Sequence, residues 1–168
     1  MPLVFGLGAP LVAMVGTCIG AGDRERALKA TWIGSAMSFA MAESVGLVAA
    51  AFPHAWLGLF GKDPAMLEAG AHYLRIVGPT YGFFGLGIVL YFASQGAGKL
   101  LWPVIGNIVR LAVALLGGWL AIRVWNSLTG VFAAQAVALV LYGCLNAWAI
   151  RAGAWFGPVR WPGAVRAA

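Results

Sequence analysis

Residues 15–29 read VGTCIGAGDRERALK, and here a charge-free apolar run gives way to five charged residues within seven positions. Gly20 and Gly22 can adopt positive φ and end a helix, while Asp23 can cap the next helix and place negative charge at its positive end. Basic residues beside the end of a membrane span mark its cytoplasmic side, and this stretch holds the densest basic cluster in the chain. It therefore predicts a tight cytoplasmic turn between two membrane helices, which sets the direction of every later span.

The composition is typical of an integral membrane protein. The 168-residue chain is 62% hydrophobic and only 10% charged, and its mean hydropathy is +0.88. A soluble domain of this length could not bury so much apolar surface. The isoelectric point is about 9.9, but the basic residues stand at the ends of apolar runs and do not share one polar face. We therefore predict a lipid bilayer around the chain and no nucleic acid as a partner.

The apolar runs predict an all-α fold, a polytopic membrane bundle over residues 1–151 with about five transmembrane helices. The predicted spans are residues 2–22, 28–52, 74–94, 101–122 and 129–150. Each can cross a hydrocarbon core of about 30 Å. Asp63 followed by Pro64 predicts a helix start before the third span. Residues 152–168 form a predicted cytoplasmic tail, whose basic and aromatic residues, Trp155 among them, are typical of an interfacial anchor.

The distribution of basic residues supports this orientation, with seven on the predicted cytoplasmic side and three outside. The cytoplasmic set is Arg24, Arg26, Lys29, Lys99, Arg151, Arg160 and Arg166, and the outer set is Lys62, Arg75 and Arg123. Five spans that end in the cytoplasm place Met1 outside, with no basic residue or signal sequence to bring it there. We therefore expect a preceding helix, and a longer polytopic protein of which this chain is a truncated piece or one partner.

A few polar side chains interrupt the spans. The candidates for a substrate or ion pathway are Glu43, Arg110, Asn107, Gln135, Tyr142 and Asn146. A charge near the bilayer centre costs about 2.5 to 3.5 kcal/mol on an insertion scale. Since Glu43 and Arg110 differ in depth by roughly one helical turn, we predict that they pair directly or through water. The pair can act as a proton relay or cavity wall, or simply hold two helices together. The polar residues of the last span can line a cavity or hydrogen-bond between helices.

The third span is predicted to be the most deformable. Pro79 removes a helical hydrogen bond, and Gly78 and Gly82 add little side-chain packing, so these three residues are hinge candidates. A close-packing surface explains the same pattern. In the second span, small residues recur every four positions and predict a packing face; they are Ser38, Ala42, Gly46 and Ala50.

The sequence contains no pattern typical of an enzyme, a metal site or a phosphate-binding loop. His54 and His72 have no cysteines or acids at ligand spacing, and residues 96–99 lack the spacing of a P-loop. Cys18 and Cys144 lie inside apolar segments and are predicted to be small packing residues. We therefore predict a protein that is not an enzyme, binds no metal and uses no cofactor.

Three groups of residues carry a resemblance to a known family. They are VGTCIGAGD at residues 15–23 with Arg26 and Ala27, LFGKDP at residues 59–64 with Gly70, Tyr73, Leu74 and Arg75, and the turn at residues 96–98 with Pro103. In order and spacing they resemble the C-terminal lobe of the multidrug and toxic compound extrusion (MATE) family, up to about residue 151. Members have twelve spans in two six-helix lobes, so the resemblance matches these spans to spans eight to twelve. The chain departs from the family at Thr17 and Cys18, where amides are usual.

The resemblance implies a secondary antiporter of the plasma (inner) membrane, with a cytoplasmic C-terminus. It would export amphipathic organic cations or other xenobiotics in exchange for H⁺ or Na⁺, together with the missing first lobe or a partner chain. Family cation sites often use acids in the first lobe and in spans seven and ten, but the match to span ten has no acid within the membrane. Any coupling acid retained in this chain would therefore have to be Glu43, to which the resemblance itself assigns no role. The alternatives are a non-transporting scaffold or remnant, and a flippase for lipid-linked substrates of the same superfamily.

Overall fold

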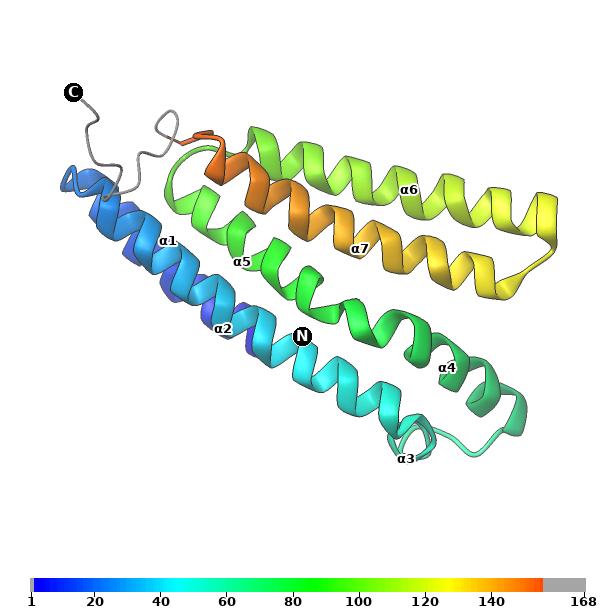
Figure 1. Cartoon of the computed structure of the whole chain (residues 1–168). Helices are drawn as coiled ribbons and strands as arrows, with labels where there is room; N and C mark the ends of the chain where they lie inside the picture. Colours follow the sequence, from blue (N-terminus) through cyan, green and yellow to red (C-terminus); the bar gives the residue numbers. More distant parts are fainter. Residues whose placement is uncertain (1, 156–168) are drawn as a thin grey trace, which may run out of the picture.

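The computed structural model describes residues 2–155, and it is all-helical in that range, which confirms the predicted fold class (Figure 1). The elements are α1 (Pro2–Gly20), α2 (Arg24–Ala51), α3 (Pro53–Leu57), α4 (Pro64–Val77), the 3₁₀ turn η1 (Gly78–Thr80), α5 (Tyr81–Gly96), α6 (Leu101–Trp125) and α7 (Leu128–Arg151). Asp23 caps α2 through a hydrogen bond that its side chain accepts from the Arg26 N–H at 3.0 Å. Asp63 caps α4 in the same way.

Four helical units in the described range are long and apolar enough to cross a membrane. They are α2, the unit Pro64–Gly96 that joins α4, η1 and α5, then α6, and finally α7. The helix α1 is also apolar but shorter, over Val4–Gly20. The large apolar side chains of α6 are mostly exposed, as expected of a helix that faces lipid rather than water.

The helix α5 lies at the centre of the bundle. It packs against α1, α2 and α7, whereas α6 packs almost entirely against α7. Figure 1 shows the α1–α2 turn, the α5–α6 turn and the end of α7 at one end of the bundle, with α3 and the α6–α7 turn at the other. Gly22 and Gly98 take positive φ in the first two of these turns. The turns are therefore grouped at two ends, as the predicted topology requires.

The contact between α2 and the α4–α5 unit depends on small residues, as the four-residue stripe of α2 predicts. A Cβ atom added to Gly46 would collide with the carbonyl oxygen of Gly78. A Cβ added to Gly78 would lie 2.7 Å from the carbonyl oxygen of Gly46. Two turns further along, Ser38 Oγ donates a hydrogen bond to the carbonyl of Gly85 at 3.1 Å. The two backbones thus approach too closely for side chains, a packing mode common between membrane helices.

Trp155, at the start of the predicted tail, is buried against the helix bundle. Its side chain is 6% exposed, and its Nε1 donates a hydrogen bond to Ser94 Oγ near the end of α5 at 3.3 Å. This part of the predicted anchor therefore packs onto the bundle. The rest of the predicted anchor, residues 156–168, lies outside the described residues.

Candidate functional site

Glu43 is positioned by α2 against the start of the central helix α5. Pro79 has no N–H, and the chain passes through the η1 turn here before α5 begins. The first N–H groups of a helix have no partner within it. One of these groups, the N–H of Gly82, donates to Glu43 Oε2 at 2.7 Å. Glu43 therefore caps α5 from a neighbouring helix, and its negative charge lies at the positive end of that helix.

Glu43 and Arg110 do not form the direct ion pair that their depths predict. No ion pair between Glu43 and Arg110 occurs within residues 2–155, because the Glu43 carboxylate binds the start of α5. The guanidinium carbon of Arg110 lies 5.5 Å from the centre of the Phe84 ring and 5.4 Å from the centre of the Tyr142 ring. The reason is that the two residues lie on helices that are not neighbours in the bundle. Arg110 is on α6, which packs on α7, and α5 lies between α6 and α2.

Arg110 lies at the wall of a cavity between α5 and α6. The cavity has a volume of about 370 Å³, and Asn107 and Tyr142 also line it. Arg110 Nε is buried and has no hydrogen-bond partner among the described residues. The guanidinium lies instead over two neighbouring aromatic rings, Phe84 and Tyr142, whose centres are 6.3 Å apart, and a cation over such rings is stabilised by the ring electrons. The structure thus brings three of the pathway candidates together: Arg110, Asn107 and Tyr142.

The other candidates lie elsewhere. Asn146 is 2% exposed, and its Nδ2 donates to the carbonyl of Tyr142 in its own helix at 2.9 Å. It contacts Gly106 of α6 and is not part of the cavity wall. Gln135 is partly buried on α7, also away from this cavity. Among the hinge candidates, Gly78 and Gly82 are buried in the contact with α2, and Pro79 is exposed.

Comparison with known proteins places these features in a family. The family model described as MatE matches residues 1–120, well over half of the chain. The chain belongs to the MATE family. The match spans α1 to α5 and most of α6, so it includes both Glu43 and Arg110. No solved structure matches the chain significantly.

A curated relative of this MATE chain is "Probable multidrug resistance protein NorM" of Thermotoga maritima. It is 27% identical over 131 aligned residues, and the match covers 69% of this chain and 28% of the relative. The chain therefore spans less than a third of the length of that relative. The family and this relative establish membership of a family of multidrug efflux transporters.

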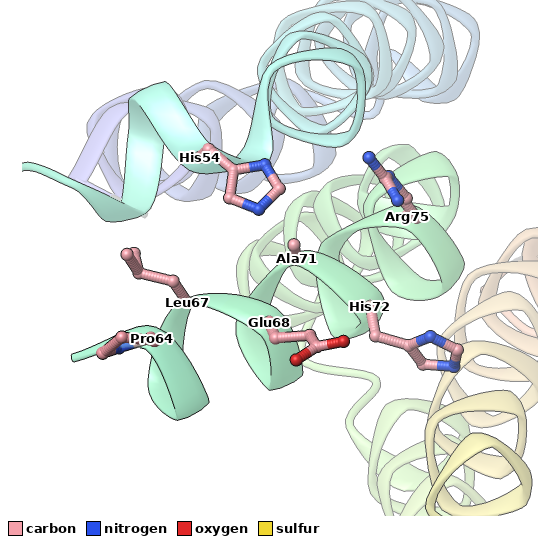
Figure 2. A pocket seen from close by; sticks show the side chains of 7 residues that line it. All are labelled: His54, Pro64, Leu67, Glu68, Ala71, His72 and Arg75. Carbon is pink, nitrogen blue, oxygen red and sulfur yellow. The ribbon is translucent and has the colours of Figure 1, made fainter. Parts of the chain in front are cut away.

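A second cavity of the MATE chain, of about 510 Å³, lies at the α3 end of the bundle. Figure 2 shows that its two imidazoles do not converge: His54 faces the cavity from α3, and His72 points toward α7. His72 Nε2 lies 3.0 Å from Thr129 Oγ1, within hydrogen-bond distance. No group of three or more His, Cys, Asp or Glu side chains that could hold a metal occurs in the described range.

The aromatic walls of the Arg110 cavity were not predicted from the sequence. Phe84, Ile88 and Tyr91 line it from α5 at spacings of four and three residues, which place them on one helix face. Gly87 lets the helices close there, because a Cβ at Gly87 would collide with the Tyr142 ring. The aromatic spacing was a usable signal, but in an apolar span it is equally typical of lipid-facing or core residues.

Proposed function

We propose that the chain is the C-terminal-lobe part of a secondary multidrug or xenobiotic efflux antiporter, coupled to H⁺ or Na⁺ and active together with the other lobe. The observation that carries the proposal is the hydrogen bond between the Glu43 carboxylate and Gly82 at the break before α5. A carboxylate within a span is a group that can bind a proton or a hard cation. Here the same carboxylate holds the start of the central helix.

Ion binding at Glu43 would act on α5 through charge. A protonated acid loses most of its attraction for the positive end of a helix, so α5 would be freer to move about the Gly78–Thr80 turn. The coupling ion and the substrate would then compete through the position of one helix, as antiport requires.

The proposal is tested by efflux from cells. We expect cells that express this chain together with spans one to seven of a homologous transporter to extrude a fluorescent xenobiotic. Cells with either part alone should retain it, since neither part has the full set of spans. The amount of the chain in the membrane must be equal in the cells that express it alone and in the cells that express both parts. Retention of the compound with both parts present would instead favour the non-transporting scaffold.

The orientation in the membrane gives a separate prediction. In a background in which Cys18 and Cys144 are replaced by serine, an impermeant thiol reagent should label Lys62→Cys in intact cells and spare Glu25→Cys. The reason is that the basic turn before α2 is retained in the cytoplasm, which puts the α3–α4 segment outside. Lysed cells, in which both cysteines should react, provide the control. The opposite labelling pattern would overturn the orientation.

A further inference from the structure

The cavity beside Arg110 combines aromatic walls with polar groups. Rings from α1, α5 and α7 line it, while α6 contributes Asn107 and Arg110. These two residues are three apart and so lie on one face of α6. Tyr91 also lines the cavity, and its hydroxyl oxygen accepts a hydrogen bond from Gln95 Nε2 at 2.9 Å. The Tyr91 proton therefore remains available for donation to a ligand. A volume of about 370 Å³ is suitable for a small molecule.

The charge in this cavity is positive and lacks a counter-ion from the described residues. Arg110 is the only charged side chain among the described residues that line the cavity. It is a partly buried residue whose Nε has no hydrogen-bond partner among the described residues, and its guanidinium lies beside the Phe84 and Tyr142 rings. A cation so deep in a span is costly without an anion or water, and buried donors without acceptors destabilise the fold. An anionic ligand would remove both penalties.

A carboxylate on a flat aromatic body fits both features of the cavity. The guanidinium presents paired N–H groups that match the two oxygens of a carboxylate, and aromatic side chains bind a flat ring by stacking or edge contacts. An organic cation would meet a fixed positive charge and no acid among the described lining residues. We propose that this cavity binds a small aromatic carboxylate, with the carboxylate at Arg110 and the ring between the aromatic walls.

This inference deepens the proposed function by naming a substrate class, and it rests on that function only for the step from binding to transport. It also departs from the organic cations that the family resemblance implies. Binding can be measured on the chain by itself, without any transport step. Binding of the acid in this cavity, together with retention of the fluorescent xenobiotic by cells that carry both parts, would contradict the proposed function alone.

The test is calorimetric titration of the full chain in phosphatidylcholine nanodiscs. The probes are 2-naphthoate, 2-naphthylmethanol and 2-naphthylmethylammonium, which share one ring system and differ in charge. We expect naphthoate to bind at least about tenfold more tightly than the alcohol, and the ammonium to bind no better than the alcohol. Arg110→Gln should remove the preference for the acid. Arg123→Gln, which removes an exposed cation of the same helix, should leave it unchanged.

Three results would overturn the inference. They are equal binding of the acid and the ammonium by the unmodified chain, an unchanged preference in Arg110→Gln, and displacement of naphthoate by phosphatidylglycerol in the nanodisc, which would identify a lipid phosphate as the occupant. The first and third use no variant, so they decide the matter even if Arg110→Gln does not fold. Asn107→Ala gives a further check, since it changes an exposed lining residue and should weaken binding of naphthoate severalfold.

Discussion

Gly46→Ala should lower the free energy of unfolding by about 1 to 3 kcal/mol, the usual cost of overpacking a tight contact. The new methyl group would collide with the backbone carbonyl of Gly78, and it would lie 3.0 Å from Tyr81 Cβ. A backbone atom cannot turn aside as a side chain can, so α2 must move away from the η1 turn and the start of α5. Unfolding in mixed micelles, followed by the loss of helical circular dichroism, measures the change.

Gly6→Ala is the matched control. It is also a glycine in an apolar helix, but nothing lies within 4 Å of the Cβ that it would gain. Alanine has the higher helix propensity by about 1 kcal/mol, so this variant should be as stable as the parent chain or slightly more stable. Equal stability of the two variants would show that the close α2–α5 approach does not contribute to the fold.

Replacement of Glu43 should separate its structural effect from its effect on coupling. Glu43→Gln keeps an oxygen that can accept the Gly82 N–H, so the stability of the chain should change little. Glu43→Leu leaves that buried N–H unpaired, which should cost about 1 to 3 kcal/mol. In cells that also carry the rest of the transporter, Glu43→Gln should abolish the dependence of efflux on a proton gradient, because an amide takes up no proton near neutral pH. It should weaken a dependence on a Na⁺ gradient, because the amide oxygen binds a hard cation without a full negative charge.

Measurements of micellar stability and of efflux under imposed pH or Na⁺ gradients check the two parts independently. Gradient-driven efflux by Glu43→Gln at the parental rate would rule out Glu43 as the coupling group while leaving its capping role intact. Equal stability of the Leu and Gln variants would show that the hydrogen bond to Gly82 adds nothing to the fold.

The helices, their caps and the glycine contact could be predicted because each depends on residues near one another in the chain. Asp23 and Asp63 precede apolar runs, and the four-residue spacing that includes Gly46 defines one face of a helix. The pairing of Glu43 with Arg110 was predicted from depth alone. Depth follows from the rise per residue, but the direction in which each side chain points depends on how the helices are arranged around α5.

The Arg110 cavity could not be predicted from the sequence for a related reason. Its lining comes from α1, α5, α6 and α7, and no spacing within one helix reveals which rings of other helices will meet. The sequence identified Arg110, Asn107 and Tyr142 one at a time, as polar interruptions of apolar spans. Their convergence depends on α6 packing against α7 while standing apart from α5.

The cap that Glu43 provides to α5 has a consequence for which residues can change together in evolution. If Pro79 were replaced by a residue with an N–H, the helix could run unbroken, and the N–H of Gly82 could bond to Gly78 within its own helix. Glu43 would then be a carboxylate inside the membrane without its donor, a state that selection removes. Conversely, loss of the acid makes the break before α5 harmful. We therefore expect descendants and relatives of this chain to keep the proline and the acid together or to lose both.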